Sequence, residues 1–257
     1  MSLDGKVILV TGAGRGLGQS IARAYAAHGA EVIGVSNVRQ ELDFTGELIR
    51  VEGGRATMMC VDLANEAQVR QMVNRVLERF VGLDVLVNNA ARLPRKLFRD
   101  MTMDDWDLTM TVNLRAAVLL CKLFLETMIE RGGGSIISVS SGAAVRGFEK
   151  ETDYCASKFG LEGFMRSLAL ELRPHNIAVN TVTPGGVVGT VRIKPTSMTQ
   201  NEFEMLPIQE RARWDDSMIL TEAFVYLALQ DASDVTGERF YAYDLAERIR
   251  REGWDIS

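Results

Sequence analysis

KVILVTGAGRGLG, residues 6–18, joins a short run of apolar and β-branched residues to a glycine-rich segment. The run at 6–11 predicts a buried strand, and the glycines directly after it let the backbone approach a bound anion closely. A helix predicted from about residue 17 would turn its N-terminus towards the same anion. A strand, a glycine turn and a helix in this order are typical of an α/β unit that binds a pyrophosphate.

The spacing of the glycines distinguishes between the known phosphate-binding patterns. A P-loop requires a lysine where this chain has Gln19, and Leu17 and Gln19 occupy the places for the third glycine of G-x-G-x-x-G. The alternative of a glycine-rich turn without a ligand is disfavoured by its place after the first strand. The pattern that fits is T-G-x-x-x-G-x-G, formed by Thr11, Gly12, Gly16 and Gly18.

Short apolar runs alternate with longer amphipathic stretches along the whole chain. Strands this apolar, separated by helices, predict a parallel sheet that is buried on both faces. We expect an α/β fold, a Rossmann-like doubly wound seven-stranded parallel sheet with helices on both faces, in a single domain over residues 1–257. The predicted strands are 6–11, 31–36, 55–61, 83–88, 135–140, 177–182 and 238–243. The predicted helices are about 17–28, 40–52, 66–80, 104–130, 153–172 and 215–230.

The composition excludes several classes of function. Hydrophobic residues make up 47% of the 257 positions, which is ample for a core, and the net charge of −5 offers no basic surplus for a nucleic-acid partner. The three cysteines are too few and too scattered for a disulfide framework, which favours a reducing compartment. Neither of the two histidines shows the spacing of a metal ligand, so we expect no metal site.

The most apolar long stretch is AAVLLCKLFLETMIE, residues 116–130, which Lys122 and Glu126 interrupt at helical spacing. This pattern predicts a packed helix rather than a membrane span. The N-terminal sequence enters the first predicted strand without an apolar signal region. We therefore expect a cytoplasmic protein with no membrane contact.

A second motif, TDYCASKFG at 152–160, places Tyr154 and Lys158 on one face of a predicted helix, because they are four residues apart. A free phenol has a pKa of about 10 and a free ammonium about 10.4, so the pair alone does not separate chemistry from two surface residues. Ser141 lies just past the fifth predicted strand, and Asn113 lies in the long helix after the fourth.

Several spaced motifs follow one another along the chain: the glycine loop, Asp62-Leu63, Asn88-Asn89-Ala90, Asn113, Ser141, Tyr154, Lys158 and Pro184-Gly185. With them the chain resembles the short-chain dehydrogenase/reductase family over about residues 5–242. The resemblance implies hydride transfer between a nicotinamide cofactor and a carbonyl or secondary alcohol, with Tyr154 as general acid or base. It also implies that Ser141 hydrogen-bonds the substrate oxygen, that Lys158 binds the nicotinamide ribose and that Asn113 holds a water molecule in a proton relay.

The charge of Lys158 would assist Tyr154 in this role. Lowering a tyrosine pKa from about 10 to about 7 requires roughly 4 kcal/mol of differential stabilisation. One positive charge at about 4 Å supplies roughly that much at an effective dielectric constant near 20. Tyr154 would then exchange protons near physiological pH, while the hydride chemistry belongs to the cofactor.

The resemblance assigns further residues to the dinucleotide. Asp62 would accept a hydrogen bond from the adenine amino group. It could instead cap the helix predicted from Glu66, and both roles could hold together. Thr190 would contact the carboxamide, although it falls one residue later than usual. The other expected cofactor-binding residues are Thr11, Gly12, Arg15, Gly16, Leu17, Gly18, Leu63, Asn89, Ala90, Pro184 and Gly185, together with Tyr154 and Lys158.

The choice of cofactor depends on the end of the second predicted strand. An acidic residue there accepts from the adenosine ribose and repels a 2′-phosphate. Ser36 takes this place, and residues 36–39 contain no acid. Arg15 and Arg39 could both pair with a phosphate, which favours NADP over NAD. The alternative is that both are ordinary solvated arginines.

The substrate is less closely defined than the cofactor. Basic residues on segments near the expected pocket favour an anionic or polar carbonyl compound, but solvated surface charge explains them equally well. We expect residues 191–214 to form a substrate lid and residues 244–257 a charged helical tail. The basic residues are Arg92, Arg95, Lys96, Arg146, Arg192 and Lys194.

Two other classes of function stay open. A cofactor-binding regulator without turnover is disfavoured by the intact Ser141, Tyr154 and Lys158, and an epimerase or dehydratase is disfavoured by the short C-terminal part. The resemblance also implies a homo-oligomer, a dimer or tetramer, in which the helices at about 104–130 and 153–172 pack between subunits.

Overall fold

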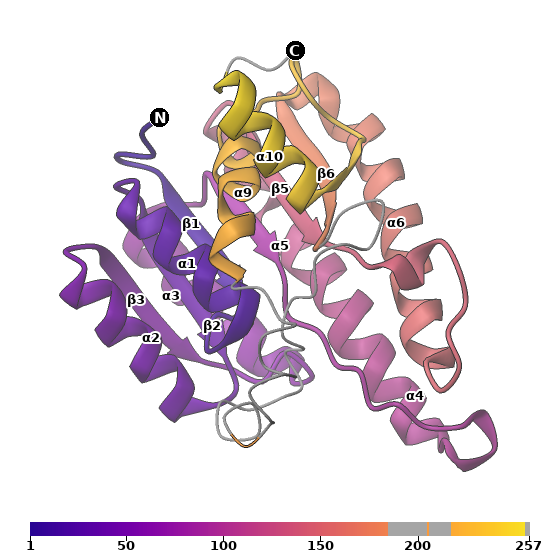
Figure 1. The fold of residues 1–257 in the computed structure, drawn as a ribbon. Coiled ribbons are helices and arrows are strands. Elements are labelled where there is room, and N and C mark those ends of the chain that lie inside the picture. Colours follow the sequence, from indigo (N-terminus) through magenta and orange to yellow (C-terminus); the bar gives the residue numbers. More distant parts are fainter. Residues whose placement is uncertain (185–204, 206–216, 255–257) are drawn as a thin grey trace.

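The computed structural model describes residues 1–184, 205 and 217–254 (Figure 1). Within these residues, seven strands form one sheet in the order β3-β2-β1-β4-β5-β6-β7, and all neighbouring strands are parallel. The predicted doubly wound α/β sheet is therefore confirmed. Its strands are β1 (Val7–Thr11), β2 (Glu31–Ser36), β3 (Arg55–Cys60), β4 (Val85–Asn88), β5 (Gly134–Val139), β6 (Ile177–Thr183) and β7 (Arg239–Tyr241).

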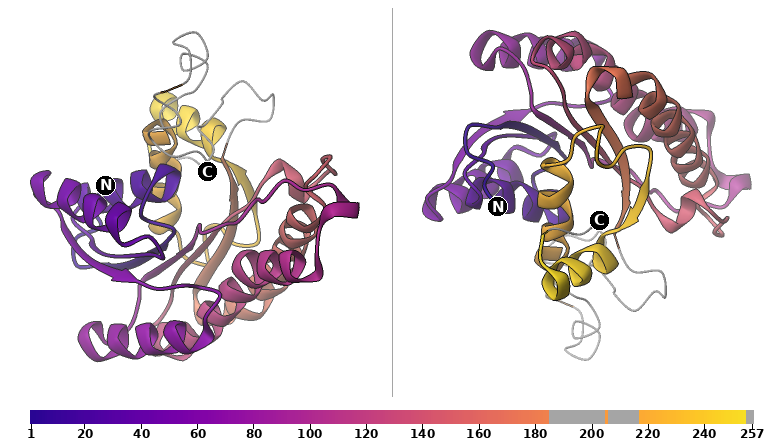
Figure 2. Two further views of the ribbon diagram at one scale, coloured as in Figure 1. Left: turned by 90° about the horizontal axis from the view of Figure 1, so that it is seen from below. Right: turned by 90° about the horizontal axis from the view of Figure 1, so that it is seen from above.

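Helices cover both faces of the sheet (Figure 2). Side chains of β1 alternate between the two apolar cores, with Ile8 and Val10 in one and Leu9 in the other. The helices of the first face are α1 (Gly16–Ala27), α2 (Arg39–Val51), α9 (Thr221–Ala228) and α10 (Ala242–Glu252). Those of the second face are α3 (Glu66–Phe80), α5 (Ala116–Glu130) and α6 (Thr152–Leu172).

The start of α3 corrects one expectation. Asn65 caps this helix, because its side chain accepts from the backbone N–H of Gln68 at 3.1 Å. The alternative role of Asp62 as the helix cap is therefore wrong. The Asp62 carboxylate accepts instead from the N–H of Ala64 at 2.9 Å, which shapes the turn after β3.

The helix expected over 104–130 is divided into three parts. α4 (Met103–Met110) begins with a capping box of Thr102 and Asp105, and a π-helical turn at Thr111–Arg115 joins it to α5. A π turn holds one extra residue, and such turns are frequent at functional sites. Here the turn carries the buried Asn113.

The span Met103–Glu130 is long and apolar enough to cross a membrane by length and composition alone. Core helices of folded proteins satisfy the same criteria. In this fold Leu120, Phe124 and Met128 of α5 are buried in the core of the second face. The prediction of a packed helix agrees with this placement.

The C-terminal elements differ in detail from the expectation. The described part of the helix predicted at 215–230 is a 3₁₀ turn at Ser217–Leu220 followed by the shorter α9. The expected charged tail forms α10 within the described residues, and it lies beside α9 (Figure 1). Its apolar side, with Leu245, Ala246 and Ile249, is buried. The tail is therefore an amphipathic helix of the first face.

Candidate active site

A cavity of about 850 Å³ lies at the carboxyl ends of the strands. Its wall includes residues that directly follow five different strands, namely Gly12, Asn37, Val61, Asn89 and Ser140. The strand order reverses between β1 and β4, and sheets of this kind bind ligands at that point. The cavity is therefore the candidate ligand site of this fold.

The glycine loop leaves no room for side chains. Gly12 has a positive φ of 68°, and a Cβ atom there would lie 2.8 Å from Nδ2 of Asn89. A Cβ atom on Gly18 would lie 2.1 Å from the carbonyl oxygen of Gly12. The loop is a backbone cradle at the start of α1, which fits the pyrophosphate of a dinucleotide.

Thr11 and Asn89 hold this loop against the end of β4. Thr11 Oγ1 accepts from the backbone N–H groups of Asn89 at 2.9 Å and Ala90 at 3.1 Å. The Asn89 side chain donates back to the carbonyl of Thr11 at 2.8 Å. Thr11 therefore shapes the site from beneath, while Gly12, Asn89 and Ala90 line the cavity.

The part of the cavity wall expected at the adenosine carries both a basic and an acidic residue, Arg15 and Asp62. Arg15, Leu17, Ser36, Asp62 and Leu63 line it as expected for the adenosine end. Arg39, Gly16 and Gly18 are not among the described lining residues, and Arg39 is exposed and paired with Asp43 at 3.6 Å.

The fold adds an acid that residues 36–39 lack. Glu41, in the first turn of α2, lines the cavity and pairs with Arg15 at 3.1 Å. The sequence analysis did not predict Glu41 at the cavity, because it looked for an acidic residue only at positions 36–39.

Tyr154, Lys158 and Ser141 line the same cavity. The Lys158 ammonium lies 5.6 Å from the centre of the Tyr154 ring and donates to the carbonyl of Val139 at 2.7 Å. Burial raises the pKa of Tyr154 above its ordinary value, and a hydrogen bond with Ser141 opposes this rise. The expected lowering of the Tyr154 pKa by Lys158 is thus not what the structure shows.

Lys158 is itself shifted in the opposite sense. Complete burial lowers its pKa to about 8, because the low-polarity interior disfavours the ammonium, and the nearby carboxylate of Glu162 opposes this fall. The charge that was expected to assist Tyr154 is therefore only partly maintained at alkaline pH.

Asn113 joins the end of β4 to α6. Its Oδ1 accepts from the backbone N–H of Arg92 at 2.7 Å, and its Nδ2 donates to the Arg92 carbonyl at 2.9 Å and to Ser157 Oγ at 3.0 Å. A small cavity of about 10 Å³ lies between Asn113, Lys158 and Asn88. The buried Oδ1 of Asn88 has no partner among the described residues. The cavity has about the volume and polarity that one water molecule requires.

Behind Ser141 lies a buried ion pair that the sequence reasoning missed. Glu162 on α6 and Arg239 on β7 approach to 3.5 Å, with side chains only 8% and 11% exposed. Arg239 donates to the Ser141 carbonyl at 2.8 Å, and Glu162 accepts from Ser140 and from Thr181. The sequence did contain one indication of this pair. Glu162 lies four residues after Lys158, on the same face of the predicted helix, which would place its carboxylate near the proposed site.

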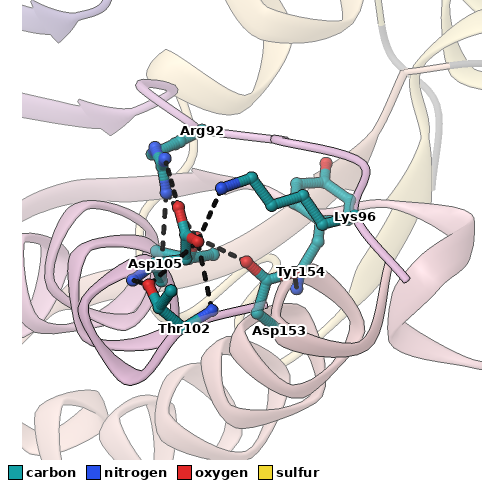
Figure 3. A network of polar contacts seen from close by, with 7 residues as sticks. Arg92, Lys96, Thr102, Asp105, Asp153 and Tyr154 are labelled. Carbon is teal, nitrogen blue, oxygen red and sulfur yellow. Dashed lines mark hydrogen bonds and ion pairs between the residues drawn. The ribbon is translucent and has the colours of Figure 1, made fainter. Parts of the chain in front are cut away.

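The loop after β4 is fixed by its own ion pairs (Figure 3). Arg92 and Lys96 both pair with Asp105, whose pKa lies below its ordinary range because Lys96 and Thr102 donate hydrogen bonds to it. Asp153 on α6 accepts from Thr109 at 2.7 Å and from the backbone N–H of Tyr154 at 2.8 Å. This network therefore connects the loop and α4 to the residue that precedes Tyr154.

Four of the basic residues that favoured an anionic substrate contact other side chains in the structure. Arg92 and Lys96 share the carboxylate of Asp105, Arg95 pairs with Glu151 at 3.2 Å, and Arg146 stacks on Phe148. Three of the cations that suggested an anionic substrate are thus paired with acids. The other predictions of this region, namely Gly185, Thr190, Arg192, Lys194 and the lid at 191–214 apart from Met205, lie outside the described residues. In the described part of the chain, no group of three or more His, Cys, Asp or Glu residues is placed to hold a metal ion.

Comparison with known proteins extends this picture. Residues 6–201 match the family described as short chain dehydrogenase. A D-threitol dehydrogenase from Mycolicibacterium smegmatis is 32% identical over 237 residues, covering 91% of this chain and 90% of that protein.

Two solved structures share the fold with this chain. A metagenomic short-chain oxidoreductase in complex with NADP is 31% identical, with a TM-score of 0.78 and coverage of 93% of this chain and 98% of that one. A carveol dehydrogenase from Mycobacterium avium in complex with NAD is 25% identical, with a TM-score of 0.78 and coverage of 93% and 96%. Both cofactors therefore occur among proteins similar to this one.

Proposed function

The chain belongs to the short-chain dehydrogenase family, a family of oxidoreductases, and on this basis we propose that it transfers a hydride between NAD(P) and a carbonyl or secondary alcohol. One observation carries the proposal. Tyr154, Lys158 and Ser141 line the same cavity as Gly12 and Asn89 of the glycine cradle. A proton donor and a dinucleotide site thus share one cavity.

The glycine cradle and Lys158 would hold the cofactor in this proposal. Gly12, Leu17 and Asn89 would line the pyrophosphate region, Asp62 and Leu63 the adenine region, and Lys158 would reach the nicotinamide ribose. When bound, the nicotinamide supplies or accepts the hydride. Arg15 on the cavity wall is the residue that favours NADP, with NAD as the alternative. The ion pair of Arg15 with Glu41 works against a 2′-phosphate and weakens this preference.

Tyr154 would act as the general acid in reduction and the general base in oxidation. Ser141 hydrogen-bonds the phenol and would also bind the substrate oxygen, which fixes that oxygen next to the proton donor. Because burial raises the pKa of Tyr154, the free protein favours the protonated phenol, which is the form that carbonyl reduction needs. Lys158, Asn113 and the small cavity between them support a path by which the phenol regains its proton.

The described cavity wall supports a substrate with an apolar body. Leu93 and Pro94 from the loop after β4, together with Leu108 and Val112, contribute to that wall. The three basic residues of the same loop, Arg92, Arg95 and Lys96, are held in ion pairs with Asp105 and Glu151, which reduces the charge that they offer to an anion. We therefore favour an uncharged carbonyl or alcohol group attached to apolar carbon atoms.

The oligomeric state stays a prediction. Val118 on α5 and Phe159 and Leu170 on α6 are exposed apolar residues, which supports the expected packing of these helices between subunits. Size-exclusion chromatography with light scattering measures the assembly directly. A strictly monomeric protein at micromolar concentration would contradict the expected dimer or tetramer.

The first experiment is a titration of the purified protein with NADPH and NADH, followed by nicotinamide fluorescence. Saturable binding of either dinucleotide supports the proposal and sets the cofactor for a screen of carbonyl compounds. Absence of binding by both at high micromolar concentration would contradict it. Tyr154→Phe is the comparison variant for this titration. It removes the proton donor and leaves the glycine cradle intact, so it should bind the dinucleotide like the wild type.

A further inference from the structure

Glu41 and Arg15 form an ion pair at the adenosine end of the cavity. Arg15 Nη1 lies 3.1 Å from Glu41 Oε1, and both residues line the cavity together with Ser36. Their side chains are 39% and 28% exposed, so the pair is partly shielded from solvent. The pair joins the glycine loop to the first turn of α2 across 26 residues of sequence.

The backbone around this pair is held in place by three hydrogen bonds. The carbonyl of Gly14 accepts from Thr45 Oγ1 at 3.0 Å and from Gln19 Nε2 at 3.2 Å, and Gln19 also donates to Thr45 at 2.8 Å. Thr45 is fully buried on α2. The glycine loop and α2 are thus fixed to each other, which keeps Arg15 and Glu41 within reach of one another.

Glu41 also lies close to the strand end that governs cofactor choice. A Cβ atom added to Gly14 would lie 3.0 Å from Ser36 Oγ and 3.1 Å from Cβ of Glu41. Ser36 occupies the place where an acidic residue would accept from a ribose and repel a 2′-phosphate. The first turn of α2 therefore brings a carboxylate to the corner where the strand itself supplies none.

We infer that Glu41 is the specificity-determining residue at the adenosine end, where it neutralises Arg15 and limits the affinity for a dinucleotide that carries a 2′-phosphate. The inference rests on the proposed function, since it concerns the same dinucleotide site. Arg15 attracts a phosphate, but its partner repels one, and a phosphate has to displace or share the guanidinium. A dinucleotide without the 2′-phosphate meets no such repulsion.

The test compares dissociation constants for NADPH and NADH in the wild type and in Glu41→Gln. Removal of the carboxylate charge is expected to tighten NADPH binding by about tenfold and to leave NADH binding unchanged or slightly weaker. The matched control is Glu47→Gln, which makes the same charge change on the same helix. Glu47 pairs with Arg50 at 2.6 Å and is not among the described residues of the cavity wall.

A second measurement shows whether the gain in NADPH affinity comes from the lost charge of Glu41 or from a change in the shape of the site. The gain in NADPH affinity should shrink when NaCl is raised from 0.05 to about 0.5 M, because salt screens partly exposed charges. Arg15→Gln is expected to weaken NADPH binding more in the Glu41→Gln background than in the wild type, because the unpaired guanidinium attracts the 2′-phosphate more strongly than the paired one. A ratio of NADPH to NADH affinity that stays within twofold of wild type in Glu41→Gln would overturn the inference and leave the proposed function standing. No binding of either dinucleotide to the wild type would overturn both.

Discussion

The guanidinium of Arg239 donates a hydrogen bond of 2.8 Å to the backbone carbonyl of Ser141, which lies 98 residues earlier in the chain. The same guanidinium pairs with the buried carboxylate of Glu162, and it donates to Thr183 Oγ1 at 2.9 Å. Glu162 lies on α6, the helix that carries Tyr154 and Lys158. One buried ion pair thus fixes the position of Ser141 relative to the proposed proton donor.

Glu162→Gln tests the importance of this pair. The amide keeps one oxygen, which can accept from either Ser140 or Thr181 but not from both, since each donates to a different oxygen of the Glu162 carboxylate. It also leaves the Arg239 charge buried without its counter-ion, so we expect a loss of about 3 kcal/mol in the free energy of unfolding. Chemical denaturation measures this value. The control is Glu171→Gln, an exposed position on the same helix, which should change it by less than about 0.5 kcal/mol. Equal stability of the two variants would show that the pair contributes nothing.

Tyr154→Phe should remove turnover and keep cofactor binding. The phenol supplies the proton in the proposed reaction, and loss of a general acid reduces the rate by about 10²- to 10⁴-fold. The dissociation constant of the dinucleotide should stay largely unchanged, because the cradle at Gly12 and Asn89 is untouched. The measurement combines a steady-state assay on a carbonyl substrate found by screening with a fluorescence titration. A variant that kept the full rate would exclude the acid–base role and favour a different use of the site.

Lys158→Met should alter how stability depends on pH. The pKa of Lys158 is lowered by burial to about 8 from 10.5, so between these values the unfolded chain holds a proton that the folded protein has lost. The free energy of unfolding of the wild type should therefore rise with pH in this window, by up to about 1.4 kcal/mol per pH unit, relative to the variant. Below pH 8 the two curves should run parallel. Denaturation in urea between pH 7 and 9.5 checks this, and parallel curves across the whole range would contradict the shift.

Gly18→Ala should disrupt the glycine cradle. The added methyl group would lie 2.1 Å from the carbonyl oxygen of Gly12, so the loop has to move, at a cost of about 1–3 kcal/mol in stability and with loss of dinucleotide binding. Gly163→Ala on α6 is the matched control, because nothing lies within 4 Å of its added Cβ. Alanine is the better helix former there, so the control should gain about 0.5–1 kcal/mol. Unchanged binding in Gly18→Ala would mean that the cradle does not hold the ligand.

The sequence by itself determined the features that depend on local spacing. Alternating apolar runs and amphipathic stretches predicted the parallel sheet and its helices, because strand and helix periods are local properties of the chain. The positions of Gly12 and Gly18 after β1 predicted the backbone cradle, and the four-residue spacing of Tyr154 and Lys158 placed both on one side of α6. Each of these patterns lies within about 20 residues of sequence.

Only the tertiary structure decided the contacts between distant segments. Arg15 pairs with Glu41 across 26 residues, and Glu162 on α6 is buried against Arg239 on β7. No local period of the sequence predicts either contact. The same holds for charge, since the sequence shows Arg92 and Lys96 as free cations, whereas in the fold both pair with the carboxylate of Asp105. The physical reason is that burial and electrostatic pairing depend on all the groups that surround a side chain. The pKa of Tyr154 is an example. The sequence led us to expect a lowered pKa, whereas burial of the phenol in the folded protein raises it.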